Sequence, residues 1–292
     1  MIPFTRRVAL GVLIGTALQI ACLPNVLAAP KAKHVFIISF DGGKPAVMQQ
    51  SQMPVLKSML AAGAGTWKAF TVVPSITLVS HTSMLTGVHP DKHLVDWNDW
   101  IPEKGLVKVP TIFALAKQKG LTTALFAGKE KFKHLNQPNA LDDFAVPEYA
   151  AKAVAEVASK CIIEKKPNLC FIHFADSDGA GHKYGWGSPE QIQAFADEDA
   201  ALKMVRDAIN KAGIANDSVI ILSADHGGHD KTHGSTSLED MNIPWIVWGK
   251  GVKRGFQISK RVSTCDTAAT ALWLLGVPIP EEMDGKPVTS AF

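Results

Sequence analysis

In "NLCFIHFADSDGAGHKYG", residues 168–185, a continuous apolar run passes directly into a segment rich in aspartate, histidine and glycine. Apolar runs without alternation are typical of strands that are buried on both faces of a sheet. Asp176, Asp178 and His182 would therefore follow the carboxyl end of a buried strand. Open α/β sheets bind their ligands at that end of their strands.

Runs of the same kind recur along the chain, separated by segments with helical periodicity. The further strand-like runs occupy residues 34–40, 122–127, 218–224 and 243–248. The helical segments occupy residues 53–63, 109–120, 149–162, 189–213 and 265–276. This alternation predicts an α/β fold, with a mainly parallel central sheet sandwiched by helices.

Two further strand-like runs also end in acidic residues. Asp41 follows the first run in "ISFDGG", and Asp225 follows the fourth in "LSADHGG". A single aspartate in such a place is more often a helix cap or a turn residue. Three acidic strand ends on one rim, however, repel one another and are costly to desolvate unless a cation offsets them. We therefore predict a metal site at the carboxyl ends of the strands.

Histidines accompany these carboxylates. Besides His182, the segment after the fourth run contains His226, His229 and His233. Carboxylate and imidazole ligands without thiolate suit Zn²⁺ or a similar divalent ion. A calcium loop of the EF-hand type starting at Asp176 is excluded, because its twelfth position, which requires a bidentate glutamate, is Gly187.

Hydroxyl groups gather in "PSITLVSHTSML", residues 74–85, where a helix could begin. Ser75, Thr77, Ser80 and Thr82 are the candidates for a nucleophile. A hydroxyl at a helix N-terminus faces backbone N–H groups, which form a natural phosphate site, and a neighbouring metal would make it a better nucleophile. A helix cap rich in serine and threonine is the alternative interpretation.

The N-terminal 28 residues have the pattern of a signal peptide. Two arginines precede an apolar stretch that is short for a membrane-spanning helix, and Ala28 ends a small-residue cleavage motif. Cleavage after Ala28 would leave residues 29–292 as a single catalytic domain without a membrane span. We expect the protein to be periplasmic or secreted.

Charge and cysteine content exclude some classes of protein. Removal of residues 1–28 takes away two arginines and no acid, so the formal charge falls from +3 to +1. That balance gives no sign of a nucleic-acid-binding surface. Cys161 and Cys170 are close enough in sequence to pair in an oxidising compartment, which would leave Cys265 over. The cysteines are too scattered for a thiolate zinc site.

Taken in order, the motifs resemble the alkaline phosphatase superfamily, specifically its nucleotide pyrophosphatase/phosphodiesterase (type I phosphodiesterase) branch. The matching pieces span residues 35–288 and read "ISFDGG", "PSITLVSHTSMLTGVHPDKH", "DSDGAGHKYG", "SADHGGHDKTHG" and "DTAATALWLLGVPIPEEMDGKPV". The resemblance implies an alkaline-phosphatase-like fold. It also implies hydrolysis of small-molecule phosphate esters, either phosphodiesters and pyrophosphates of nucleotide type or phosphomonoesters.

The resemblance further implies two Zn²⁺ ions bridged by the substrate phosphate. Thr77 is the implied nucleophile and would form a phospho-threonine intermediate that water then hydrolyses. Ser80 stands where the family motif has a phosphate-contacting asparagine, so it is expected to bind substrate. The ligands implied for one ion are Asp41, Thr77, Asp225 and His226, and those for the other are Asp178, His182 and His233.

Two alternatives remain open at this point. One is hydrolysis of a phosphonate or another ester on the same scaffold, although the Cys/Ser-x-Pro-x-Arg sequence of sulfatases is absent around residue 77. The other is a periplasmic metal- or phosphate-binding protein without turnover. Lys129 and Lys131 follow a strand, and two interpretations are open: that they reach a phosphate oxygen, or that they are solvated loop charges, which is the one we expect. Trp97, Asn98 and Trp100 are expected to contact a leaving group or to pack the loop. The sequence does not indicate an oligomeric state.

Overall fold

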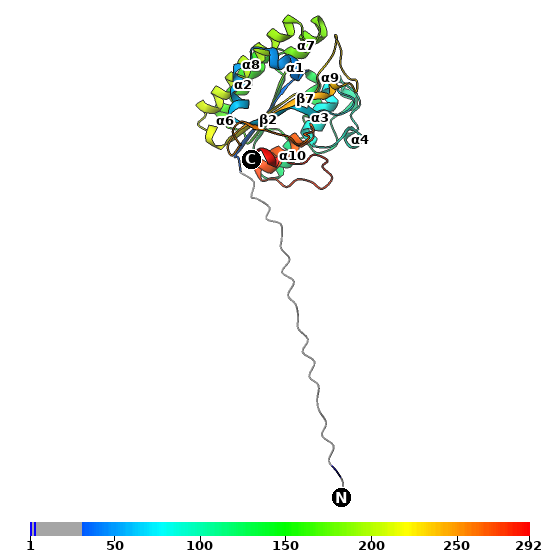
Figure 1. The fold of residues 1–292 in the computed structure, drawn as a ribbon, viewed down its shortest axis with the longest axis vertical. Coiled ribbons are helices and arrows are strands. Elements are labelled where there is room, and N and C mark those ends of the chain that lie inside the picture. The colour runs from blue at the N-terminus through cyan, green and yellow to red at the C-terminus, as the bar shows by residue number, and fades with distance from the viewer. Residues whose placement is uncertain (2, 4–30) are drawn as a thin grey trace.

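The computed structural model describes Met1, Pro3 and residues 31–292, and in this part of the chain an eight-stranded sheet lies between two layers of helices (Figure 1). The strands follow the order β4-β3-β5-β1-β6-β7-β2-β8. Neighbouring strands are parallel except along β7, which is antiparallel to both β6 and β2. The predicted α/β fold with a mainly parallel sheet is confirmed.

The strands are β1 (His34–Phe40), β2 (Ala64–Phe70), β3 (Thr123–Ala127), β4 (Asp143–Ala145), β5 (Leu169–Phe174), β6 (Ser218–Ser223), β7 (Asn242–Gly249) and β8 (Phe256–Gln257). The α-helices are α1 (Pro45–Gln50), α2 (Pro54–Ala62), α3 (Thr77–Thr86), α4 (Pro90–His93), α5 (Ile112–Gln118), α6 (Ala151–Lys165), α7 (Asp176–Tyr184), α8 (Pro189–Lys211), α9 (Leu238–Met241) and α10 (Asp266–Leu275). Short 3-10 helices are η1 (Pro102–Lys104), η2 (Glu130–Leu135), η3 (Ala215–Asp217) and η4 (Thr289–Ala291).

The central strands are apolar throughout because both of their faces are covered. In β1 the side chains of Phe36 and Ile38 join one hydrophobic core, while Val35 and Ile37 join the other. The first core is shared with α2, α6 and α8, and the second with α3, α5 and α10 (Figure 1). Because strand side chains alternate between the two faces, this double burial removes the polar positions of a half-exposed strand.

The acidic and histidine-rich segment after β5 forms a helix, α7. Asp178 and His182 are separated by one helical turn, so both side chains lie on the same face of α7. Gly179 and Gly181, in the same helix, leave space for neighbouring side chains. A Cβ atom on Gly179 would lie 2.5 Å from the Tyr149 hydroxyl, and one on Gly181 would lie 2.8 Å from the Trp186 ring.

The C-terminal part of the chain packs beneath the helix that carries Thr77. Helix α10 contacts both α3 and β1. The backbone N–H groups of Asp284 and Gly285 donate to the carbonyl of Gly87, at 3.0 and 2.9 Å, where α3 ends. The Met283 side chain fills the space beside Gly87, so close that a Cβ atom there would lie 2.6 Å away. The end of α3 is therefore held by residues almost 200 positions later in the chain.

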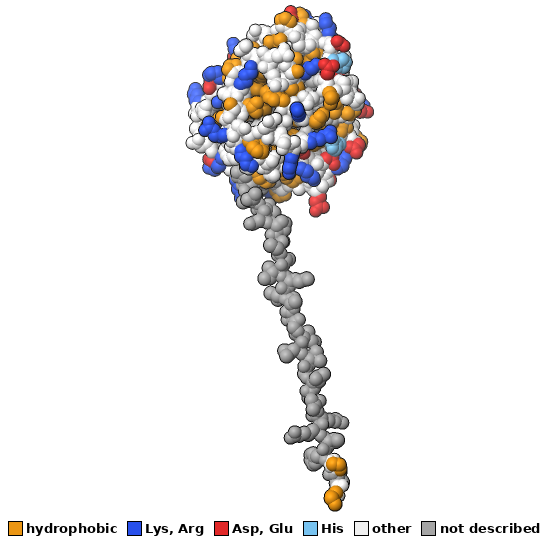
Figure 2. Space-filling view, in the orientation of Figure 1, with side chains coloured by type: hydrophobic (Ala, Val, Ile, Leu, Met, Phe, Trp, Pro, Cys, Tyr) orange, Lys and Arg blue, Asp and Glu red, His pale blue; other side chains and the backbone are white. Residues whose placement is uncertain are grey.

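Several other expectations concern regions around this core. Apart from Met1 and Pro3, the expected signal peptide lies outside the described residues. None of the helices in residues 31–292 combines the length and apolar character that crossing a bilayer requires. Cys161, Cys170 and Cys265 are all buried free thiols. Figure 2 shows lysine and arginine side chains dispersed over the face in view, without a continuous basic stripe.

Candidate metal centre

The topology brings the acidic strand ends together. Strands β5, β1 and β6 are consecutive in the sheet, so their carboxyl ends lie side by side. Asp41 directly follows β1, Asp178 lies in the first turn of α7 after β5, and Asp225 lies two residues after β6. Gly42, with a left-handed φ of 68°, turns the chain after Asp41 so that its N–H donates to Asp225 Oδ1 at 3.1 Å.

One cluster consists of Asp178, His182 and His233, whose candidate ligand atoms all lie within 4.8 Å of one another. Asp178 Oδ1 is 3.4 Å from His182 Nε2 and 3.7 Å from His233 Nε2. The Nδ1 atoms of both histidines face backbone carbonyls, of Lys231 at 3.0 Å and of Ser75 at 2.9 Å. Because a carbonyl only accepts, each Nδ1 donates, and each Nε2 presents a lone pair to Asp178.

A second cluster lies beside the first. Asp41, Asp178 and His226 meet the same 4.8 Å criterion, and Asp225 adjoins them. His226 Nε2 is 3.4 Å from Asp41 Oδ1 and 3.2 Å from Asp225 Oδ2. His226 Nδ1 donates to the Gly227 carbonyl at 2.8 Å, so Nε2 is the ring nitrogen that faces the two carboxylates. Asp178 thus lies close to both clusters and not only to the one that the resemblance implies.

The clusters contain buried polar atoms that no protein group satisfies. Among the described residues, four such atoms converge here: Asp41 Oδ1, Asp178 Oδ1, Asp225 Oδ2 and His226 Nε2. A buried acceptor without a partner costs about 1–3 kcal/mol, and a charged one costs more. Four acceptors of oxygen and imidazole type that face one another are a donor set suited to divalent cations such as Zn²⁺. The residues present therefore fit a metal centre.

The crowding of acids shifts their protonation. Burial, together with the charge of Asp41, raises the pKa of Asp225 to about 8. Burial opposes protonation of His226, but Asp225 and Asp41 outweigh it and raise the pKa of His226 to about 9. Burial and the neighbouring His226 lower the pKa of His233 to about 4. Strongly shifted groups in one place are a common mark of functional sites.

Lys129 supplies a positive charge that we did not expect at this site. Its Nζ lies 2.7 Å from Asp41 Oδ2 and 2.6 Å from Asp178 Oδ2, and only 12% of its side chain is exposed. The expectation of a solvated loop charge was therefore wrong for Lys129. The signal for the alternative, that Lys129 reaches the site, was its place two residues after β3, which pairs in parallel with β5 and so ends on the same rim. Lys131 is partly buried and makes no ion pair with the described residues.

Thr77 is the first residue of α3 and is almost fully buried. Its hydroxyl makes no hydrogen bond to any described residue. The neighbouring Leu78 N–H donates to Asn98 Oδ1 at 2.9 Å, so the loop after α4 reaches the N-terminus of this helix. His233 Nδ1, as noted, donates to the carbonyl of Ser75, which ties the helix approach to the first cluster.

Ser80 lies elsewhere. It is fully buried, and its hydroxyl accepts a hydrogen bond from Thr71 at 2.9 Å. Ser80 is one helical turn beyond Thr77, where its side chain packs inward. Its role in substrate binding stays a prediction. Asn98, from a different loop, is the amide group that lies beside Thr77.

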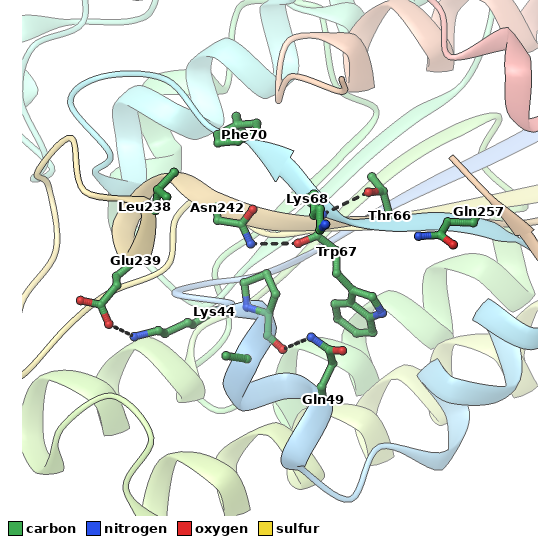
Figure 3. Close-up of a pocket in the computed structure, with 12 residues that line it drawn as sticks. Lys44, Gln49, Thr66, Trp67, Lys68, Phe70, Leu238, Glu239, Asn242 and Gln257 are labelled. Atoms are coloured by element: carbon green, nitrogen blue, oxygen red, sulfur yellow. Dashed lines mark hydrogen bonds and ion pairs between the residues drawn. The ribbon is translucent and has the colours of Figure 1, made fainter. Parts of the chain in front are cut away.

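A separate groove of 790 Å³ runs between α1 and β2 (Figure 3). Trp67 and Phe70 form part of its wall, and the ion pair between Lys44 and Glu239, 2.6 Å apart, lies at one side. None of the residues proposed as metal ligands lines this groove. It is therefore distinct from the candidate metal centre.

The decisive comparison is with a protein family model. The model for type I phosphodiesterase / nucleotide pyrophosphatase matches residues 35–243. The chain belongs to this family. The match covers Asp41, Thr77, Asp178 and the segment from Asp225 to His233. The resemblance seen in the sequence is thereby confirmed at the level of the family.

This chain is shorter than the curated proteins to which it is similar. It is 24% identical over 246 residues to ectonucleotide pyrophosphatase/phosphodiesterase family member 7 of Rattus norvegicus, covering 74% of this chain and 55% of that protein. It is 32% identical over 228 residues to the 2,3-bisphosphoglycerate-independent phosphoglycerate mutase of Paracoccus denitrificans, covering 70% of this chain and 41% of that protein. The chain thus spans about half the length of these relatives.

Solved structures show the same fold. Murine ectonucleotide pyrophosphatase / phosphodiesterase 5, an inactive variant in complex with AMP, superposes with a TM-score of 0.75 at 14% identity. That match covers 89% of this chain and 99% of the murine chain. A 2-O GAG sulfatase superposes with a TM-score of 0.66 at 17% identity, covering 88% of this chain and 73% of the sulfatase. The alkaline-phosphatase-like architecture is therefore shared with enzymes of different substrates.

Proposed function

We propose that this protein is an exported two-metal phosphohydrolase that cleaves small phosphodiesters or pyrophosphates of nucleotide type, or phosphomonoesters. The observation that carries the proposal is the convergence of four buried ligand atoms that lack hydrogen-bond partners, close to the helix N-terminus that carries Thr77. His81 connects the two, because its Nδ1 lies 2.8 Å from the Thr77 carbonyl and 3.4 Å from Asp225 Oδ2. Membership of the phosphodiesterase family supports a phosphoester hydrolase. The murine structure with AMP supports a nucleotide-like substrate, and the N-terminal sequence supports export.

The proposed ligands are those expected from the sequence. Asp41, Thr77, Asp225 and His226 would hold one ion, and Asp178, His182 and His233 would hold the other. The proximity of Asp178 to both clusters is compatible with this assignment. When bound, two Zn²⁺ ions would neutralise phosphate charge and make the Thr77 hydroxyl more acidic.

In the proposed reaction, the Thr77 oxygen attacks phosphorus and the bond to the leaving oxygen breaks. The result is a phospho-threonine and a free alcohol or phosphate. Water then attacks the same phosphorus, which releases phosphate or a phosphomonoester and restores the hydroxyl of Thr77. In the first turn of α3 the N–H groups of Leu78 and Ser80 are already bonded, to Asn98 Oδ1 and to the Ile76 carbonyl. The N–H groups of Thr77 and Val79 are the ones that would face the phosphate.

Two residues that the sequence left aside enter this proposal. Asn98 accepts the Leu78 N–H through Oδ1, and its amide nitrogen makes no hydrogen bond to the described residues. That nitrogen could donate to a phosphate oxygen next to Thr77. Lys129, paired with Asp41 and Asp178, would place its ammonium group beside the same phosphate.

The test is a substrate panel on zinc-loaded protein. We expect hydrolysis of bis-p-nitrophenyl phosphate or p-nitrophenyl phosphate, and loss of roughly 10³-fold or more in kcat for Thr77→Ala, because the nucleophile is removed. The variant should retain its zinc, measured by elemental analysis. Activity on a phosphonate or sulfate instead would favour the alternative ester hydrolase. Bound zinc with no turnover on any substrate would favour a binding protein.

A further inference from the structure

Two histidines that are not proposed ligands lie directly beneath the metal centre. His173, in β5, and His81, in α3, are both fully buried, and their rings meet edge to face with centroids 5.1 Å apart. Each contacts a different carboxylate of the second cluster. His173 contacts Asp41, and His81 contacts Asp225.

The proton of His173 is placed by its two partners. The Gly128 N–H donates to His173 Nδ1 at 3.3 Å, so this nitrogen is an acceptor. The proton of a neutral ring must then be on Nε2, which donates to Asp41 Oδ2 at 2.7 Å. Lys129 also donates to Oδ2, so Asp41 is held from that side and Oδ1 is left to face His226.

His81 has the opposite arrangement. Its Nδ1 is 2.8 Å from the carbonyl oxygen of Thr77, which only accepts, so Nδ1 carries the proton. The same Nδ1 lies 3.4 Å from Asp225 Oδ2. Its Nε2 accepts the hydroxyl of Ser39 at 2.7 Å. His81 therefore contacts both the backbone of the proposed nucleophile and a proposed ligand.

We propose that His173 and His81 are positioning residues for one metal ion and act through opposite ring nitrogens. His173 Nε2 orients Asp41 by a hydrogen bond, whereas His81 Nδ1 holds the Thr77 backbone by a hydrogen bond and limits the position of Asp225 by contact at 3.4 Å, without bonding to it. The inference rests on the proposed function, because it assumes that these carboxylates bind metal. Ligand-orienting hydrogen bonds of this kind are a general feature of metal sites.

The surroundings of the rings leave little room for a substitute donor. The Phe132 ring lies 4.8 Å from that of His81 and 4.5 Å from that of His173, and Phe171 lies 5.7 Å from His81. In this closed aromatic environment the lost N–H of either histidine is not replaced by solvent. If the rings only filled space, however, the effect of a substitution on Zn²⁺ affinity would depend on the volume of the new side chain. It would not depend on where that side chain places its N–H group.

A crossed pair of amide substitutions separates these two roles. A glutamine amide nitrogen reaches the position of Nε2, whereas an asparagine amide nitrogen reaches only that of Nδ1. We expect His173→Asn to weaken Zn²⁺ binding by about 10- to 100-fold and His173→Gln to recover most of the loss. At position 81 the order should reverse, with His81→Gln impaired and the smaller His81→Asn recovered. Zn²⁺ affinity would be measured by competition with a chelating dye.

Smaller substitutions protect the test against misfolding. Ser39→Ala removes the partner of His81 Nε2 and should weaken Zn²⁺ binding by up to about 10-fold. Ser223→Ala is the matched control: Ser223 is the register partner of Ser39 on β6, equally buried, and its hydroxyl donates to the Pro244 carbonyl. It should leave Zn²⁺ affinity unchanged. Urea unfolding of the zinc-free variants shows which of them are folded.

The outcomes are distinct. The inference would be overturned if the same amide, asparagine or glutamine, restored Zn²⁺ affinity at both positions 173 and 81. It would also be overturned if none of the variants changed the affinity for Zn²⁺. A wild-type protein that binds Zn²⁺ but hydrolyses no ester would refute the proposed function, while the crossed pattern of affinities would still support the positioning roles. A wild-type protein that binds no Zn²⁺ would overturn both.

Discussion

At the scale of single residues, Lys129 shows how the chain tolerates several carboxylates in one buried place. Its ammonium group bridges Asp41 and Asp178, and both contacts are short. Burial by itself would lower the pKa of Lys129, but the two carboxylates raise it above its ordinary value. In the same way, Lys129 and the two neighbouring histidines hold the pKa of Asp41 well below its usual range despite its burial.

Lys129→Met should therefore destabilise the zinc-free protein by roughly 3–5 kcal/mol, because it leaves two buried carboxylates without their counter-charge. Lys131→Met, two residues away and without an ion pair, should cost less than about 1 kcal/mol. Urea unfolding in the presence of a chelator measures both. Similar losses for the two variants would show that the bridge carries little of the stability.

At the scale of secondary-structure elements, α3 and its connection to α4 hold the proposed nucleophile. All ten residues of α3 are buried. Beyond it, His93 in α4 links back to the helix: its Nδ1 accepts the Val95 N–H at 3.0 Å, so its Nε2 carries the proton toward the Ser83 hydroxyl, also at 3.0 Å. Burial lowers the pKa of His93 to about 4, from an ordinary value of 6.5.

This shift predicts a loss of stability in mild acid. Since the unfolded chain takes up the proton near pH 6.5 and the folded one only near pH 4, the contribution of His93 is intact above pH 6.5. It falls as the pH drops to 4, by about 3 kcal/mol in all. His93→Gln, which does not titrate there, should show a correspondingly shallower decline. The measurement is urea unfolding at a series of pH values with chelator present, and parallel curves for the two proteins would contradict it.

The elements that the sequence predicted well are those buried on both faces. Strands β1, β5 and β6 appear as continuous apolar runs, and their acidic ends predicted where the candidate metal centre lies. Strand β2 was missed because "AGTWKAF" mixes small and polar residues near the edge of the sheet. The reversed direction of β7 was missed too, because hydrophobic periodicity carries no information on strand direction. No crossover helix carries the chain from the end of β6 to the opposite rim of the sheet. Strand β7 therefore starts on the rim where β6 ends and runs antiparallel to it.

For the candidate site, the sequence could not predict the direction in which some side chains point. Asp41, Asp178 and Asp225 lie within four residues of the ends of adjacent strands, so the topology alone predicts that they meet. Lys129 and Asn98 sit in loops whose path depends on tertiary packing, and no local pattern shows where such a side chain points. Ser80 was chosen from its motif position, although the helix turns it inward toward Thr71.

At the scale of the whole molecule, the candidate centre joins segments that are far apart in the chain. The proposed ligands extend from Asp41 to His233, and each comes from a loop or helix at one rim of the sheet. A metal ion bound there would connect these segments and favour the folded state. Ligand binding of this kind stabilises a protein in proportion to the logarithm of ligand concentration over Kd.

Removal of zinc should therefore lower the melting temperature. At a free zinc concentration of about 100 times Kd the stabilisation is about 2.7 kcal/mol, which corresponds to roughly 5–10 °C for a domain of this size. Differential scanning calorimetry with and without chelator measures the shift. His226→Ala should reduce it, whereas His229→Gln, on the same loop but with its ring bonded to Asp240, should keep it. An unchanged melting temperature on chelation of the wild type would argue against a structural contribution from bound zinc.

The clamp that residues 283–285 place on the end of α3 has a genetic consequence. A nonsense mutation after codon 243 would still allow every proposed metal ligand to be translated. The truncated product would lack α10 and the backbone donors to Gly87, however, so the helix that carries Thr77 would lose its support. Loss-of-function alleles are therefore expected among codons 244–292, far along the chain from the proposed metal ligands and Thr77.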